Sequence, residues 1–236
     1  MSLLSWLFNH NKNDNKSTSE VDKDAWEGSF WDVQQPFPVK ATFHIIYIDG
    51  AGNKTERTVD IKQFGALLGT NLLIGNCRLR SATRTFRTDR IQQCVDVETG
   101  EVIEDVAEYL RTKYELSPEY SRDQLRVDEY DVLRVLLYVG KADGVLRASE
   151  KVIIRDTCRE LVGDARMTDE MIDELFKNLS VPTVQAFKLA IGRLNTKSAI
   201  LKSVVFSAAE KMIATDKKIH QSEQEALDYM RKKWQI

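Results

Sequence analysis

The spacing of hydrophobic positions changes about half-way along the chain. In residues 37–102 hydrophobic and polar positions alternate, as at Phe43 and Tyr47, and a period of two predicts β-strands. Beyond about residue 127 hydrophobic positions recur every three to four residues, which predicts amphipathic helices. The two patterns occupy separate halves of the chain, so we expect an α+β protein with two domains of different class.

The alternating half predicts five short strands joined by tight turns. Asp49-Gly-Ala-Gly-Asn53 lies between the first two strands and contains residues that tolerate turn conformations, so it predicts a hairpin. Five short strands without a long helix between them are typical of a small β-barrel or a strongly curved sheet. The predicted strands span residues 43–48, 55–61, 72–80, 83–91 and 93–97, and a helix follows over 103–114.

The helical half is interrupted by turn residues at Asp143-Gly144, Gly163-Asp164, Pro182 and Thr215-Asp216. These breaks divide it into about six helices, which is enough to bury the core of a helical bundle. The predicted organisation is an apolar N-terminal segment with a flexible polar linker over 1–36, a β-barrel with a trailing helix over 37–116, a linker over 117–127 and a helical bundle over 128–236.

Composition excludes several classes of protein. Hydrophobic residues are 42% and charged residues 30% of the 236, as in folded globular chains, and the formal net charge of −2 allows only a local patch to bind nucleic acid. No apolar run approaches the ~20 residues of a membrane-spanning helix. Three scattered cysteines and three scattered histidines form no disulfide framework or metal motif, and no nucleophile–base pair is evident. We therefore expect a cytoplasmic protein that is not an enzyme.

One local patch of this kind lies in the β half. Residues 78–90, the arginine segment, contain five arginines against a single acidic residue, Asp89, and no lysine. Planar guanidinium groups bind phosphate oxygens bidentately, and a neighbouring aromatic ring can stack on a base. The predicted binding site for a nucleotide or single-stranded nucleic acid consists of Arg78, Arg80, Arg84, Phe86, Arg87 and Arg90.

Strand geometry sorts these side chains by face. Arg78 and Arg80 are expected on one face of their strand, and Arg84, Phe86 and Arg90 together on one face of the next. The alternative is an ordinary solvent-exposed sheet face, on which Arg87 pairs with Asp89 and Phe86 belongs to the core.

The order of residues in this segment resembles the WYL domain. That family has a Cys-x-Leu-Arg strand followed by Arg-x-Phe-Arg-x-Asp-Arg-Ile. The matching residues here are Cys77, Leu79, Arg80, Arg84, Phe86, Arg87, Asp89, Arg90 and Ile91. The match continues upstream through Ile46-Tyr47 and Glu56-Arg57-Thr58-Val59, and covers roughly residues 38–105.

The WYL resemblance implies an Sm-like β-barrel that binds nucleotides or single-stranded nucleic acid and serves bacterial regulators and anti-phage systems. Asn71-Leu72-Leu73 stands where the family has Trp-Tyr-Leu, so only Leu73 is retained. Residues 1–36 are too short and too polar for the winged helix of the typical family regulator. A repressor that binds a DNA operator is therefore disfavoured.

The helical half contains an internal repeat. Residues 141–150 align without a gap with residues 214–223, so a helix, an Asp-led turn and a second helix occur twice. The repeated carboxylates are candidate ligands of a divalent cation, Ca²⁺ or Mg²⁺. They are Asp143, Glu150, Asp216 and Glu223. The alternative is that these residues, with Ser149 and Ser222 as N-caps, only cap helices.

Ala142-Asp143-Gly144 followed by Ser149-Glu150, with its echo 73 residues later that lacks the Gly, resembles TerB, the tellurite-resistance family, in an all-helical setting over roughly residues 126–236. The resemblance implies a helical bundle with acidic residues suspected of binding metal, in membrane-linked stress or phage-response systems. It does not imply tellurite chemistry, because the chain has no cysteine pair or redox motif.

The first eight residues are apolar, and a polar tract follows from Asn9 to Glu20. A short amphipathic helix in this segment would lie on a membrane surface or dock on a partner. A frayed or self-docking terminus is the alternative. The candidate docking residues are Leu3, Leu4, Trp6, Leu7 and Phe8.

Together these features predict a bacterial, non-enzymatic sensor or adaptor. Its WYL-like barrel binds a nucleotide or single-stranded nucleic acid, and its TerB-like module acts in a stress or anti-phage system with other proteins. The alternative is a scaffold protein of a membrane-associated stress complex. In that case the arginine segment docks an acidic protein partner, the helical domain holds a divalent cation, and the cytoplasmic protein lies peripheral to the inner membrane.

Overall fold

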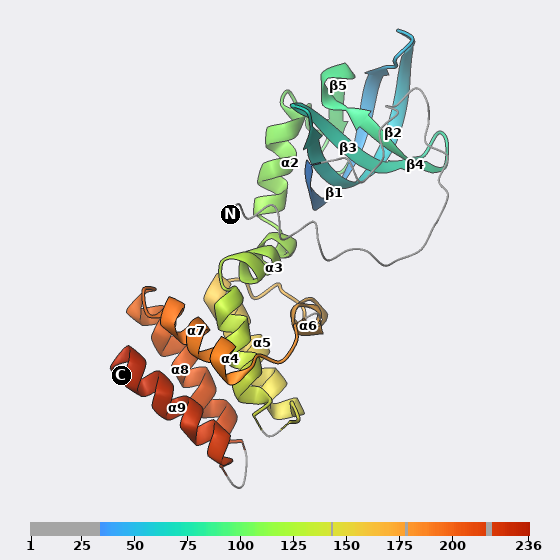
Figure 1. Ribbon diagram of the computed structural model, residues 1–236. Helices are drawn as coiled ribbons and strands as arrows, with labels where there is room; N and C mark the ends of the chain where they lie inside the picture. The colour runs from blue at the N-terminus through green and yellow to red at the C-terminus, as the bar shows by residue number, and fades with distance from the viewer. Residues whose placement is uncertain (1–33, 143, 178, 216–218) are drawn as a thin grey trace. The chain divides into compact units, whose positions relative to one another are not determined.

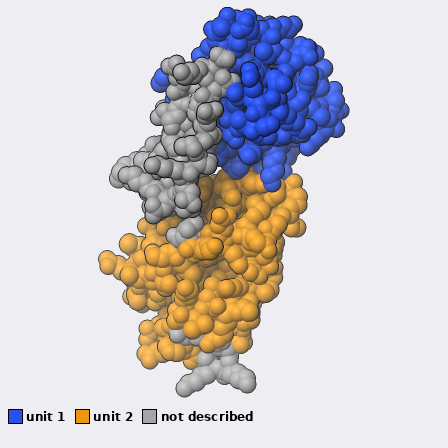
Figure 2. Space-filling view, turned by 90° about the vertical axis from the view of Figure 1, so that its right-hand side faces the viewer, with its two compact units in different colours: residues 1–117 blue, residues 118–236 orange. Residues whose placement is uncertain are grey.

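The computed structural model describes residues 34–142, 144–177, 179–215 and 219–236. The chain divides into two compact units, Met1–Ser117 and Pro118–Ile236 (Figure 2). Each unit has its own hydrophobic core, one built on the sheet and one between helices. The first unit is the α+β part and the second is entirely helical in its described residues.

Five antiparallel strands form one sheet in the order β4-β3-β2-β1-β5 (Figure 1). The strands are β1 (Gln34–Ile48), β2 (Lys54–Leu67), β3 (Thr70–Cys77), β4 (Ala82–Arg87) and β5 (Ile91–Asp96). The period-two pattern is confirmed at Phe43, Ile45 and Tyr47, whose side chains lie in the core at 0–1% exposure. The predicted hairpin is also present, because Asp49 accepts hydrogen bonds from the backbone N–H groups of Ala51 and Asn53.

The predicted closed barrel is wrong, because β4 and β5 remain the two edges of the sheet. The chain crosses between these edges through a single 3₁₀ turn, η2 (Thr88–Arg90), and residues in a helical turn offer no strand ladder. The sheet is curved nevertheless. Tyr47 of β1 packs edge-on against Phe86 of β4 at a ring-centroid distance of 5.2 Å, although two strands lie between them.

Helix α2 (Val106–Glu115) packs on the inner face of the sheet, close to where a helix was predicted. Asp105 caps its N-terminus, and Val106 and Leu110 enter the core. Asp96 of β5 holds the helix in place. Its fully buried carboxylate accepts hydrogen bonds from the Tyr109 hydroxyl, the Lys113 ammonium and the backbone N–H of Glu98, each at 2.8 Å.

Residues 118–127 form helix α3 (Pro118–Val127) instead of the predicted linker. Proline suits the first position of a helix because its φ is already helical and it has no N–H to satisfy. Leu125 is fully buried in the core of the helical unit, and Ser121 donates a hydrogen bond to Asp164 at 2.8 Å. The segment is therefore part of the second unit.

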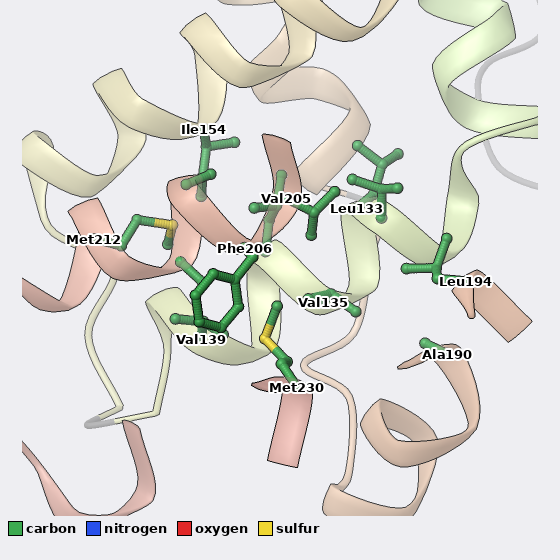
Figure 3. Packing of buried hydrophobic residues seen from close by; sticks show 14 of the residues in the cluster. Leu133, Val135, Val139, Ile154, Ala190, Leu194, Val205, Phe206, Met212 and Met230 are labelled. Carbon is green, nitrogen blue, oxygen red and sulfur yellow. The ribbon is translucent and has the colours of Figure 1, made fainter. Parts of the chain in front are cut away.

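The core of the helical unit confirms the predicted 3.6-residue period. Figure 3 shows side chains of several helices meeting in it, among them Leu133, Val139, Ile154, Ala190, Val205, Met212 and Met230. The remaining helices are α4 (Tyr130–Gly140), α5 (Ala148–Val162), α6 (Asp169–Lys177), α7 (Val184–Leu194), α8 (Ala199–Ile213) and α9 (Gln221–Trp234). Val184 falls on the same helical stripe as the buried Phe187 and Ile191, but it lies in the first turn of α7 and is 53% exposed.

The two helix pairs α4–α5 and α8–α9 repeat the same boundaries. Gly140 ends α4 and Ala148 opens α5, and the residues aligned with them in the sequence repeat, Ile213 and Gln221, end α8 and open α9. The first turn of α9 contacts the loop between α4 and α5, since the Ser222 hydroxyl donates a hydrogen bond to the Ala142 carbonyl oxygen at 3.0 Å. The sequence repeat therefore corresponds to a repeat of local structure.

Candidate nucleic-acid interface

The arginine segment does not form one face of the sheet. Arg78 and Arg80 lie in the turn between β3 and β4, not in a strand, and Arg90 ends the 3₁₀ turn η2. Arg84 and Arg87 are therefore the two arginines of the segment that lie in a strand. The predicted shared faces for Arg78 with Arg80 and for Arg84 with Arg90 are wrong, because both strands end earlier than their hydrophobic pattern suggested.

Two of these arginines form bidentate ion pairs at the surface. Arg78 binds Asp60 through Nε at 3.0 Å and Nη2 at 2.7 Å, and Arg87 binds Asp89 through Nε at 3.0 Å and Nη2 at 2.6 Å. The hydrogen bonds from the guanidinium groups lower the pKa of Asp60 and of Asp89 below their ordinary value. The Arg87–Asp89 pair is the one expected under the alternative interpretation of the segment.

Phe86 is not a stacking platform for a base. Its ring is 1% exposed and lies in the core of the sheet, against Tyr47. Arg84 occupies the same inner face two residues earlier and pairs in register with Gly75 of β3. It is half-buried, and this burial lowers the pKa of its guanidinium group. The inner face therefore contributes a shielded cation but no exposed aromatic surface.

Arg80 and Arg90 are two arginines of the segment whose guanidinium groups are not held in an ion pair by another described residue. Arg80 is exposed and Arg90 half-buried, and no carboxylate within the described part of the chain forms an ion pair with either. A phosphate group could bind them without displacing a counterion of the protein. These two positions flank β4, one before the strand and one after it.

Arg57 of β2 is a site candidate that the sequence analysis missed. Its side chain is buried at 5% exposure; Nε donates to Thr55 Oγ1 at 3.0 Å and Nη1 lies 3.9 Å from Cys77 Sγ. A hydroxyl and a thiol are weak partners for a buried guanidinium. The signal was present in the sequence, because Arg57 falls on the inward phase of the alternation that continues to Val59 and Ile61.

A cleft of about 390 Å³ lies beside the arginine segment, between η2, β5 and the start of α2. Asp89, Glu104 and Asp105 line it, and its lining includes no arginine or lysine. Three carboxylates repel a phosphate group. An anionic ligand would therefore bind on the arginine surface outside this cleft.

The acidic repeat of the helical unit is described in part. Asp143 and Asp216 lie outside the described residues. Glu150 and Glu223 are buried at 2% and 1% exposure, and each accepts a hydrogen bond from a helix-capping backbone N–H, from Arg147 at 2.6 Å and from His220 at 2.7 Å. Within the described ranges, no group of three or more His, Cys, Asp or Glu could hold a metal ion.

The prediction that Ser149 and Ser222 are N-caps is wrong. Arg147 and His220 are the N-cap residues of α5 and α9, so Ser149 and Ser222 lie two positions inside the helices. The glutamates that complete the two capping boxes are Glu150 and Glu223, and Glu225 instead accepts a hydrogen bond from the Gln221 side chain. The sequence repeat identified the right loops but placed the helix starts two residues late.

The predicted docking residues of the N-terminus, Leu3, Leu4, Trp6, Leu7 and Phe8, lie outside the described residues. Their role on a membrane or a partner stays a prediction. In the part of the chain that is described, every helix is too short or too polar to cross a lipid bilayer.

Residues 39–95 match the WYL domain. The match runs from β1 to β5 and includes Arg57 and the whole arginine segment. It ends before α2, so the helical unit lies outside the WYL match.

Among solved structures, proteasome accessory factor B/C (PafBC) of Arthrobacter aurescens aligns with this chain at 11% sequence identity and a TM-score of 0.25, over 90% of this chain and 52% of that chain. The chain thus spans about half the length of that protein. No curated protein matches this chain.

Proposed function

We propose that this protein is a non-enzymatic regulatory sensor whose WYL domain binds a nucleotide or single-stranded nucleic acid through the arginine segment. The proposal rests on which arginines inside the WYL match form ion pairs with carboxylates and which do not. Arg80 and Arg90 offer guanidinium groups that no carboxylate of the described residues holds in an ion pair. Arg78 and Arg87 add exposed ion pairs, which contribute little to stability and which a phosphate group can displace.

The mode of binding follows from the burial of Phe86. Without an exposed aromatic ring the arginine segment has no aromatic platform for bases, so affinity comes from phosphate contacts. Such binding depends strongly on salt and weakly on base sequence. We therefore expect the domain to recognise the phosphate groups of its ligand.

The helical unit is proposed to be the TerB-like module that couples ligand binding to a stress or defence response. Its support is the repeated helix pair, α4–α5 and α8–α9. The alternative function, a scaffold that docks an acidic protein, uses the same arginine surface. Binding experiments with nucleic acid separate the two functions.

The test changes Arg80 and Arg90 together to alanine. We expect affinity for a single-stranded oligonucleotide to fall at least about tenfold at 50 mM salt. The slope of log Kd against the logarithm of the salt concentration should decrease by about one to two. Fluorescence anisotropy measured from 50 to 300 mM NaCl gives both quantities. Arg111→Ala is the matched control, because Arg111 is 51% exposed on α2, outside the WYL match.

Equal binding by the double variant and the unchanged protein would refute the assignment. Absence of binding to nucleotides and to single-stranded DNA and RNA by the unchanged protein would instead favour the acidic protein partner. Circular dichroism is expected to be unchanged, since both side chains lie at the surface or its edge.

A further inference from the structure

A second hydrophobic surface lies on the outer face of the sheet. Leu72 and Ile74 of β3 point away from the core that contains Leu73, because successive side chains of a strand face opposite sides. Both are almost fully buried, at 1% and 3% exposure, with the partly buried Leu67 of β2 packed against them. We call Leu67, Leu72 and Ile74 the outer β3 patch.

The sheet itself does not provide a cover for this patch. The residues that pair with Leu72 and Ile74 are Gly65 and Gln63 on β2, and Arg87 and Thr85 on β4. They stand beside the patch, and they are small or polar. Helix α2 packs against the other face of the sheet. In a single layer of sheet, near-complete burial of two outward side chains requires an apolar segment from outside the sheet.

We propose that residues 24–33 of this same chain dock on the outer β3 patch. This segment reads Asp-Ala-Trp-Glu-Gly-Ser-Phe-Trp-Asp-Val and supplies three large aromatic side chains, Trp26, Phe30 and Trp31. It directly precedes β1, so its local concentration at the sheet is high.

The register of the strands places the start of β1, which residues 24–33 precede, near the outer β3 patch. Gln34, the first residue of β1, pairs with Ala66 of β2, and Ala66 pairs with Asn71 of β3. Residues 24–33 therefore join the sheet at the start of β1, which lies two strands, or about 10 Å, from β3. This point is level with Asn71, the residue before Leu72. Ten residues span up to ~33 Å, so the segment can reach the whole patch.

The charge of residues 24–33 also favours docking on the outer β3 patch. Residues 24–33 contain three acidic residues and neither lysine nor arginine. Arg87 lies beside Leu72 in the strand register, and its guanidinium is paired with the exposed Asp89. An acidic aromatic segment matches an apolar patch that has an arginine at its border, because its carboxylates can bind that guanidinium in place of Asp89.

Disulfide trapping tests the location directly. Leu67→Cys, at the half-buried rim of the patch, is combined in turn with Trp26→Cys, Phe30→Cys and Trp31→Cys. The native thiols do not interfere, because all three cysteines are buried and burial raises the pKa of Cys94 and Cys158 to about 12. The matched control pairs the same three substitutions with Val97→Cys, which is 51% exposed at the end of β5.

We expect at least one Leu67→Cys pair to form an intramolecular disulfide in the full chain, at least tenfold faster than its Val97→Cys control. Equal rates at the two positions would overturn the proposal. Failure of all three pairs, or cross-linking only between two copies of the chain, would overturn it too and in the second case would show that another copy covers the patch.

A double-mutant cycle gives an independent measurement. The triple change of Trp26, Phe30 and Trp31 to alanine is expected to lower the Tm of the sheet unit by about 4–8 °C and to raise binding of a hydrophobic dye. The change Leu72→Ala should then cost clearly less than in the unchanged protein, since its contacts are already lost. Additive effects would contradict the proposal. Alanine at Trp6, Leu7 and Phe8 is the control, with no expected change in the Tm of the sheet unit.

Discussion

Close packing between neighbouring strands leaves little space around β3. A Cβ atom added to Gly75 would lie 2.4 Å from the Asp60 carbonyl oxygen and 2.9 Å from the Ile61 Cα atom. The register of β2 against β3 shifts at this point, between Ile61 and Gln63, and brings the two backbones together. Glycine is therefore required here for close approach, not for an unusual backbone conformation.

The change Gly75→Ala is expected to lower the free energy of unfolding by about 2–3 kcal/mol, because backbone atoms must move apart. Urea denaturation measures the loss. Gly192→Ala in α7 is the opposite control: no atom lies within 4 Å of its added Cβ, and alanine in a helix is expected to raise stability by about 0.5–1 kcal/mol. A neutral Gly75→Ala variant would be inconsistent with the observed strand spacing.

Asp96 is expected to make the sheet unit sensitive to acid. Burial raises the pKa of its carboxyl group, but the hydrogen bonds from Lys113 and Tyr109 outweigh burial, so the pKa lies below its ordinary value of 3.8. A carboxyl group with a lower pKa in the folded state stabilises that state above its unfolded pKa, and the stabilisation is lost as pH falls.

Asp96→Asn should therefore cost about 2–3 kcal/mol at pH 7, and its difference from the unchanged protein should shrink as pH falls below about 4. Urea unfolding at pH 7, 5 and 3 checks both statements. Glu98→Gln is the control, since Glu98 is 67% exposed and lies 3.9 Å from the same Lys113. A constant difference at all three pH values would contradict the role given to Asp96.

At the scale of elements, the helix pairs α4–α5 and α8–α9 share a capping device. In each pair a buried glutamate accepts a hydrogen bond from the N–H of the N-cap residue three positions earlier. The capping role accounts for one carboxylate oxygen of Glu150 and of Glu223 without any metal ion. It also explains why these residues recur at the same place in both copies of the repeat.

Removing these carboxylates separates capping from cation binding. Glu223→Ala is expected to cost about 1–2 kcal/mol, whereas Glu223→Gln keeps an acceptor oxygen and should cost less. We expect millimolar Ca²⁺ or Mg²⁺ to leave the Tm of the unchanged protein unaltered. A rise in Tm with either ion, lost in the Glu150→Gln, Glu223→Gln double variant, would show a cation site instead.

At the scale of the whole molecule, the two units have separate cores. The core of the helical unit consists of residues from α3 to α9, and the core of the sheet unit of residues from the strands to α2. A domain that contains its own hydrophobic core can fold alone.

Residues 118–236 expressed alone are therefore expected to give a helical circular dichroism spectrum and a cooperative urea transition. Leu136→Asp is the control, because Leu136 is fully buried and an uncompensated charge there should abolish the transition. A non-cooperative transition of the unchanged fragment would mean that the helical core needs the first unit.

The sequence by itself determined the elements with a local period. The alternation at Phe43, Ile45 and Tyr47 and the repeated helix pair depend on neighbours close in the chain, so both were predicted with the correct type of structure. The residues of the WYL match were identified in the same way, from a continuous motif.

Tertiary structure alone decided which arginines are available and whether the sheet closes. Arg78, in the turn after β3, is neutralised by Asp60 of β2, and Phe86 is buried against Tyr47. Such pairs depend on register and curvature, which the period of a single strand does not contain. The sequence pattern also did not show that β4 and β5 remain unpaired: the chain passes from one to the other through a single 3₁₀ turn at Thr88–Arg90, and residues in a helical turn do not pair as strands.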